Sequence, residues 1–409
     1  MFIPVMLIVI LPFIQLGVSY YASVGVIGVL LILWYQREQM PVLFGRFLLV
    51  RLAVVALMVI FTWGYPGSGS DILRAAREGV FFFLATGCTG WRLHAPQRDA
   101  AGVSRYARLL CLALFGLLVL QTIFLSRGVY FGIPKGLFSQ NGGVIAGDLD
   151  LYYSDIRPNG PYGEPSYLGG VCLCILFALG PLLLKSRLVN HSTGLALVVV
   201  VLSRSFSGIL FCMLVLFANL WKPVRSFSTR IALAAGIVAV CTLVLMTENT
   251  ITDRLDKLRS GDDVSSMARV FQPLTIIPDI LTRQPTGIPM NRFIDMGYVP
   301  AVGVYTEELV HNGLLNLILN YGWAGLAAIA VLIAVLPTLN SRLFVMLLSM
   351  QNGAFLTPDK FVLIALSMMI YNTCRVRLPV QARQRPQRQA GEVETKAVYR
   401  PVTQVQPWQ

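Results

Sequence analysis

The chain has 409 residues, of which 56% are hydrophobic and only 13% charged, and its mean hydropathy is +0.67. A soluble domain carries about 25% charged residues, so this composition excludes an ordinary soluble enzyme. Apolar runs of about 17 to 20 residues recur along the sequence, each long enough to cross a bilayer as a helix, whereas the strands of a transmembrane β-barrel would alternate. The net charge of +13 does not indicate nucleic-acid binding, because most Lys and Arg residues lie in short loops between the runs. The predicted fold class is all-α, a polytopic inner-membrane helical bundle.

About twelve transmembrane helices are predicted. In chain order they cover residues 2–18, 20–36, 47–64, 78–91, 109–125, 166–184, 193–203, 208–221, 231–247, 311–338, 343–356 and 361–374. The first run lacks the basic segment of a signal peptide and is interpreted as a retained helix. With the N-terminus inside, the short inner loops hold 12 Lys and Arg residues and the short outer loops hold four. This bias predicts that both termini are cytoplasmic.

Two predicted outer loops, 126–165 and 248–310, are too long to be simple connections, and loops of this length usually carry function. They belong to a predicted transmembrane domain over 1–374, which is followed by a disordered basic cytoplasmic tail over 375–409. All seven cysteines lie in or beside apolar runs, and the chain has only three histidines. We therefore expect no disulfide framework, no metal centre and no cofactor, and we expect the chemistry on the outer face.

The first polar segment is RPNGPYGEPS, residues 157–166, directly before the sixth run. Its prolines and glycines predict a turning backbone that holds Arg157, Tyr162 and Glu164 at the mouth of a helix. A guanidinium suits phosphate or carboxylate oxygens, and a carboxylate at an apolar boundary suits proton transfer. An interfacial Arg157–Glu164 pair that merely closes the loop is an equal alternative.

Two further arginines lie in polar outer segments. Arg204 belongs to LSRSFSG, residues 202–208, which predicts a tight reversal between two short apolar runs. Arg269 lies early in a predicted surface helix over 265–282, whose apolar face includes Leu274. For both arginines, contact with lipid headgroups is the alternative to a role in chemistry.

The tenth run opens with His311 and then places Asn312, Asn316 and Asn320 at four-residue spacing. Residues four apart share a helix face, and polar residues within a span usually face the bundle interior or water. The pattern predicts a polar pocket that descends from the outer surface, with an interhelical hydrogen-bond ladder as the alternative. No Walker A, GxSxG or dinucleotide motif occurs, so group transfer outside the cell needs an already activated donor.

Taken in this order, the segments resemble the Wzy-type polysaccharide polymerases and the related O-antigen ligases. The resemblance covers about 150 to 375. It is carried by R-x-x-G-x-x-x-E-P-S at 157–166, the serine-rich reversal at 203–208, S-x-x-R followed by P-x-G at 266–287, and His-Asn with a later Gly at 311–322. The family implies glycosyl transfer between polyprenyl-diphosphate-linked oligosaccharides at the periplasmic face. The site residues that the resemblance implies are the diphosphate-binding Arg157, Arg204 and Arg269, the base His311 with Glu164 as its alternative, and the pocket residues Tyr162, Asn312 and Asn316.

The partners implied are a lipid-linked oligosaccharide donor and acceptor and the membrane lipids, with a chain-length regulator and a flippase as further candidates and no nucleic acid. Two alternative functions stay open: an O-antigen ligase that transfers polymer to an acceptor, and a lipid-linked sugar flippase or exporter. The Glu-Pro-Ser segment favours a polymerase over a ligase by analogy. Ionisable residues are nearly absent from the middle of the runs, which favours an enzyme over a transporter.

Overall fold

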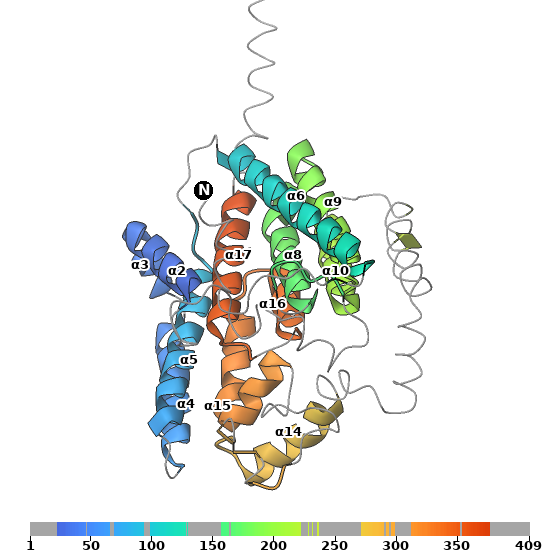
Figure 1. Cartoon of the computed structure of the whole chain (residues 1–409). Coiled ribbons are helices and arrows are strands. Elements are labelled where there is room, and N and C mark those ends of the chain that lie inside the picture. Colours follow the sequence, from blue (N-terminus) through green and yellow to red (C-terminus); the bar gives the residue numbers. More distant parts are fainter. Residues whose placement is uncertain are drawn as a thin grey trace, which may run out of the picture.

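The structure is a computed structural model of the chain (Figure 1). The described residues are 23–45, 47–65, 69–93, 99–127, 129, 157–162, 165–221, 228, 231, 235–236, 271–289, 292–293, 296–298, 312–351 and 354–376. Within these ranges the regular elements are helices, in agreement with the predicted all-α class. Most of the two predicted long loops, and the tail after Val376, lie outside the described residues.

Ten of the twelve predicted spans overlap a helix. The helices are α2 (Val24–Tyr35), η2 (Arg37–Gln39), α3 (Met40–Leu43), α4 (Leu48–Trp63), α5 (Gly69–Cys88), α6 (Asp99–Leu125), α8 (Pro165–Leu179), η3 (Gly180–Leu182), α9 (Arg187–Leu202), α10 (Phe206–Trp221), α14 (Gln272–Arg283), α15 (Gly313–Val335), α16 (Leu339–Ser349) and α17 (Pro358–Val376). The predicted span 2–18 lies outside the described residues, and 231–247 does so almost entirely.

Three described helical segments are long and apolar enough to cross a membrane, namely Gly102–Leu125, Pro165–Leu182 and Gly313–Val335. A fourth is added if the bent pair Arg37–Leu43 and Leu48–Trp63 forms one span. These findings place the chain among membrane proteins, and the count of twelve spans stays a prediction.

Helix α8 is the centre of the bundle, since every residue from Ser166 to Leu179 is buried. It packs against α9, α10, α16 and α17. Gly169 lets α10 approach closely, because a Cβ at Gly169 would lie 2.7 Å from the Cα of Gly208. Small residues commonly allow such backbone contacts between membrane helices. The peripheral α4 instead exposes large apolar side chains such as Leu49 and Trp63, as a lipid-facing helix does.

Two helices differ from their predicted bounds. Helix α5 begins at Gly69, so the predicted outer loop over 65–77 is wrong in its length. The first turns of α5 are polar and are stabilised by the ion pairs Arg74–Glu78 and Asp71–Arg292. A search for apolar runs does not detect polar helical turns. Helix α16 begins at Leu339 with a reciprocal capping box between Thr338 and Ser341, so the predicted inner loop over 339–342 is its first turn.

Helix α15 is broken at Gly322, whose φ of 52° and ψ of −125° are not helical. A Cβ at Gly325 would lie 2.0 Å from the carbonyl oxygen of Leu317. Residues eight apart on a straight helix are about 12 Å apart, so the two halves fold back on each other. Although the whole segment is long enough to cross a membrane, the predicted single span over 311–338 is therefore two half-helices that meet at Gly322.

Two buried cations donate hydrogen bonds to backbone carbonyls. The Arg51 guanidinium donates to the carbonyls of Leu43 and Phe83 and lies over the Phe83 ring. The Lys360 ammonium, 2% exposed, donates to the Leu348 carbonyl at 2.8 Å and to the Gln351 carbonyl at 3.1 Å. Lys360 thus stabilises the C-terminal end of α16. Its position in a predicted short outer loop did not indicate this burial.

Candidate functional site

The buried side chain of Gln121 in α6 anchors the segment 157–162 to the bundle. Gln121 Oε1 accepts hydrogen bonds from the backbone N–H groups of Asn159 (3.2 Å) and Gly160 (2.8 Å). Its Nε2 donates to the Gly160 carbonyl at 2.9 Å and to Asn159 Oδ1 at 3.3 Å. Gly160 has a φ of 66°, a conformation that favours glycine and turns the chain here. Three of these four hydrogen bonds hold the predicted turning backbone, and the fourth holds the Asn159 side chain.

This anchoring brings two predicted arginines together. Arg157 Nη1 donates to the backbone carbonyl of Arg204 at 3.2 Å. Arg204 itself has a φ of 52°, which is uncommon for a residue other than glycine and makes the α9–α10 reversal tight. Its neighbours Ser203 and Ser205 are buried, and Ser205 Oγ accepts from the Gly208 N–H at the start of α10. The first two predicted motifs therefore meet in space, while the predicted pocket residue Tyr162 is 1% exposed and belongs to the core.

A continuous series of contacts runs from this corner to α15. Gly208 touches Gly169, and Gly170 lies against the Gln351 side chain just after α16. Beyond Gln351, a Cβ at Gly313 would lie 2.8 Å from the backbone nitrogen of Phe355. The beginning of α15 therefore packs against Phe355, in the segment between α16 and α17.

The first half of α15 carries the three predicted asparagines, and all three are buried. Asn312 is the N-cap, because its Oδ1 accepts from the Leu315 N–H. Asn320 Nδ2 donates to Asn316 Oδ1 at 2.6 Å, whereas Asn320 Oδ1 has no hydrogen-bond partner. The asparagines thus form a short ladder within one helix, and the open acceptor lies at its far end.

The break in α15 is completed by the predicted P-x-G element. The Trp323 N–H donates to the Pro285 carbonyl at 3.0 Å, and the Leu319 carbonyl accepts from the Ile288 N–H at 2.7 Å. These two groups would bond each other in an unbroken helix. Gly287 has a φ of 84°, and a Cβ there would lie 2.5 Å from the backbone of residues 320–322. The third and fourth predicted motifs therefore meet at Gly322.

Helix α14 lies across this end of the molecule, next to α15 (Figure 1). Its buried face is centred on Ile280, which packs with Ile288, Phe293 and Leu319. Leu274 of the predicted apolar face is 61% exposed and does not belong to this buried group. Tyr298 donates to Asp279 Oδ2 of α14 at 2.8 Å, and partial burial together with this bond raises the pKa of Tyr298. The amphipathic helix and the segment after it thus form one layer over the break.

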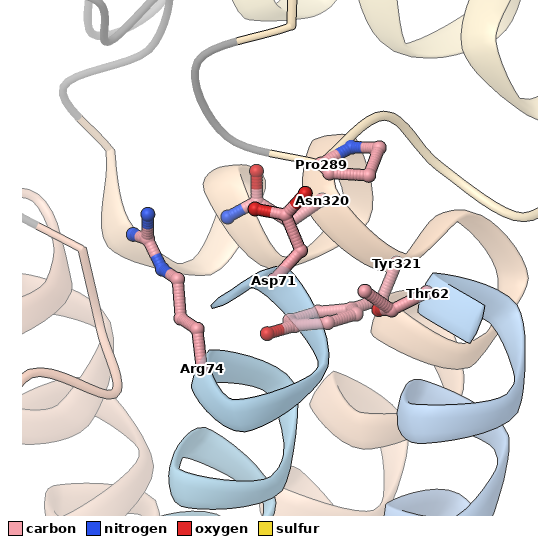
Figure 2. Close-up of a pocket in the computed structure, with 6 residues that line it drawn as sticks. All are labelled: Thr62, Asp71, Arg74, Pro289, Asn320 and Tyr321. Atoms are coloured by element: carbon pink, nitrogen blue, oxygen red, sulfur yellow. The ribbon is translucent and has the colours of Figure 1, made fainter. Parts of the chain in front are cut away.

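A small pocket opens beneath this layer, between α4, α5 and α15. Figure 2 shows the Asp71 carboxylate and the Asn320 amide facing the same space below Pro289. The lining residues are Thr62, Asp71, Arg74, Pro289, Asn320 and Tyr321.

A buried carboxylate supports the pocket from below. Glu78, 1% exposed, accepts from Arg74 Nε at 2.9 Å and from the Tyr321 hydroxyl at 2.8 Å. The bond to Tyr321 ties α5 to the residue next to the break at Gly322, so one ionic network holds both walls of the pocket.

Three predicted site residues, Glu164, Arg269 and His311, lie outside the described residues. Sequence reasoning missed Gln121 and the Arg74–Glu78–Tyr321 network. The single amide inside the apolar run of α6 was a usable signal for Gln121, and the four-residue spacing of Arg74 and Glu78 indicated a helical ion pair. In the described part of the chain, no group of three His, Cys, Asp or Glu residues could hold a metal ion.

These features define a helical membrane protein with one polar cluster at the Arg157–Arg204 corner and another beside the break in α15. The sequence profile of the WcaD colanic acid polymerase family matches residues 2–373, and the chain belongs to that family. It is a Wzy-type polymerase, a glycosyltransferase-type enzyme that joins repeat units into exopolysaccharide. No curated protein and no solved structure matches the chain significantly.

Proposed function

We propose that the chain transfers glycosyl groups between polyprenyl-diphosphate-linked repeat units at the periplasmic face of the inner membrane, with both termini in the cytoplasm. The proposal rests mainly on the contact between Arg157 and the Arg204 reversal. Two arginines from separate motifs gather at one corner of the bundle, where their forked donors suit a diphosphate. Arg269, the third predicted arginine, completes the proposed diphosphate site.

The proposed reaction forms one bond at the anomeric carbon and breaks another. A hydroxyl oxygen of the acceptor sugar forms a bond to the anomeric carbon of the donor, and the bond from that carbon to the diphosphate oxygen breaks. The diphosphate leaves with the electron pair, and the hydroxyl proton passes to a base. His311 is the first candidate for that base and Glu164 the second, because imidazole titrates near neutral pH. The arginines stabilise the charge that develops on the leaving group.

Deleting the gene tests this function directly. We expect the deletion strain to accumulate single lipid-linked repeat units, which mass spectrometry of extracted lipids would detect, and to regain polymer when the parental gene is restored. Finished polymer that stays on the lipid would instead indicate a ligase. Repeat units retained on the cytoplasmic leaflet, inaccessible to an external glycosidase, would indicate a flippase.

The membrane orientation is a separate prediction. A reporter fused after Gly261 should read as periplasmic, and one fused after Arg385 as cytoplasmic. Alkaline phosphatase and green fluorescent protein fusions at both positions would measure this, with the membrane abundance of each fusion checked by immunoblotting. A cytoplasmic Gly261 would place the proposed chemistry on the wrong face and refute the periplasmic assignment.

A further inference from the structure

We propose that the pocket between α4, α5 and α15 binds one edge of the acceptor saccharide through its hydroxyl groups. This inference rests on the proposed function, since it assigns the second of the two substrates that the polymerase must hold. The pocket is small, with room for about one water-sized group, so it suits a hydroxyl at the edge of a sugar ring and not a whole ring. The observations that carry it are an unsatisfied acceptor, the charge balance of the lining, and the position of the pocket.

The unsatisfied acceptor is Asn320 Oδ1. The Asn320 side chain is 5% exposed and lines the pocket, and its Oδ1 has no hydrogen-bond partner. In this orientation of the amide, Nδ2 donates to Asn316 Oδ1 at 2.6 Å and Oδ1 is the atom left over. Buried polar atoms without a partner are rare, so such an atom in a pocket points to a donor that arrives with a ligand. A sugar hydroxyl is a donor of suitable size.

The charge balance favours a neutral ligand. Arg74 Nε pairs with Glu78 at 2.9 Å, and Arg292 Nε pairs with Asp71 at 3.3 Å. The lining itself carries one carboxylate and one cation, Asp71 and Arg74, while Glu78 behind it is shared by Arg74 and by Arg77 at 3.6 Å. Asp71 and the Thr62 hydroxyl keep further acceptor capacity toward the pocket, because a carboxylate accepts several hydrogen bonds and Thr62 donates only to the Met58 carbonyl. A mixture of donors and acceptors suits a polyhydroxylated molecule.

The walls are rigid before any ligand arrives. The Tyr321 hydroxyl bonds Glu78 across the helices, and the Tyr65 hydroxyl donates to the Gly287 carbonyl beside the break in α15. Preorganised hydrogen-bonding groups lower the entropic cost of binding a flexible saccharide.

The position separates this pocket from the proposed diphosphate site. Arg157 and Arg204 lie on the connections around α6, α8, α9 and α10, whereas the pocket is formed by α4, α5 and α15. A polymerase must bind a diphosphate-linked donor and an acceptor at the same time. Two sites of different chemistry, joined through the half-helix that begins at Asn312, meet this requirement.

The test measures the two kinds of binding separately on purified full-length protein. One probe is a repeat-unit oligosaccharide released from the host exopolysaccharide by partial acid hydrolysis, which lacks both lipid and diphosphate. The other probe is undecaprenyl diphosphate. We expect Asn320→Leu to weaken oligosaccharide binding about 5- to 10-fold in equilibrium dialysis, the range for one lost hydrogen bond. Its affinity for undecaprenyl diphosphate should stay within about 2-fold of the parental value.

Two further variants keep the test decisive. Thr62→Val removes a lining hydroxyl with almost no change of shape and should weaken oligosaccharide binding about 2- to 5-fold. Asn340→Leu makes the same chemical change as Asn320→Leu but acts at contacts with Ala218 and Asn219, away from the pocket, so oligosaccharide binding should persist. If Asn320→Leu does not fold, oligosaccharide binding by Thr62→Val tests the pocket.

The outcomes separate this inference from the proposed function. Parental oligosaccharide binding in both Asn320→Leu and Thr62→Val, or no binding by the parental protein, would overturn the acceptor pocket. The proposed function would still stand if Arg157→Lys lost affinity for undecaprenyl diphosphate and the deletion strain accumulated single units. Conversely, Asn320-dependent oligosaccharide binding without such accumulation would count against the proposed function and leave the saccharide pocket in place.

Discussion

Replacing His311 by glutamine is expected to stop polymerisation while the protein stays in the membrane at its parental abundance. Glutamine can hold a hydrogen bond at this position but cannot take the proton of an acceptor hydroxyl. Removing a general base typically costs about 100- to 10,000-fold in rate. The following residue, Asn312, caps the half-helix that carries the buried Asn316 and Asn320. Accumulated single lipid-linked units, measured by mass spectrometry, would report the block.

The comparison with His311→Ala gives this prediction its control. Both variants should fail to polymerise if the imidazole is the base, and both should keep their affinity for undecaprenyl diphosphate. A residue with only a hydrogen-bonding role would show the opposite pattern, in which glutamine restores activity that alanine loses. Polymer production at the parental rate by His311→Gln would remove His311 from the mechanism and leave Glu164 as the candidate base.

Replacing Gln121 by leucine is expected to have the second-largest effect, although Gln121 is proposed to touch no substrate. The change leaves the buried N–H groups of Asn159 and Gly160 and the Gly160 carbonyl without their partner. Each buried polar group without a partner destabilises the folded state by about 1–3 kcal/mol. The segment should therefore shift until these groups can hydrogen-bond to water. Arg157 would then leave the Arg204 reversal. Displacing a positioning group by about 1 Å can cost about 100-fold in rate, and we expect a loss of about 10- to 100-fold in polymer output.

Two variants test the physical cause of that loss. Gln121→Glu keeps an acceptor for the two N–H groups but loses the donation to the Gly160 carbonyl, so it should retain more activity than Gln121→Leu. Thr122→Val changes the neighbouring residue, whose hydroxyl bonds only the Leu118 carbonyl within α6, and should behave like the parental protein. Affinity for undecaprenyl diphosphate should fall with polymer output in the Gln121 series. Unchanged affinity together with unchanged output in Gln121→Leu would contradict the positioning role.

The break in α15 gives a physical explanation for two motifs that are distant in sequence. An interrupted helix leaves backbone groups unpaired, and such groups are tolerated in a membrane protein only where other protein groups satisfy them. Here Pro285 and Ile288 supply the missing partners, and Gly287 allows the two backbones to approach. Both glycines, Gly287 and Gly322, adopt positive φ. The P-x-G element and the glycine after His311 are thus two halves of one joint, which forms a wall of the pocket.

Much of this protein could be predicted from the sequence alone. Hydropathy determined the all-α membrane class, because a bilayer core requires long apolar helices whatever their neighbours. The bounds of α8 and α10 agree with the predicted spans to within a few residues, since both helices are mostly apolar. The order of the polar motifs indicated the Wzy-type resemblance, and the family match confirms it.

Only the tertiary structure decided how the polar groups pair. The break at Gly322 depends on backbone hydrogen bonds to residues 285–288, and the polar start of α5 depends on contacts with Tyr321 and Arg292. Gln121 acquires its role from a segment 38 residues later in the chain. A hydropathy window counts each residue in its local surroundings, whereas the cost of burying a charge, an amide or a free carbonyl depends on partners from distant parts of the chain. The site residues could therefore be proposed from the sequence, but their grouping into two separate polar clusters required the fold.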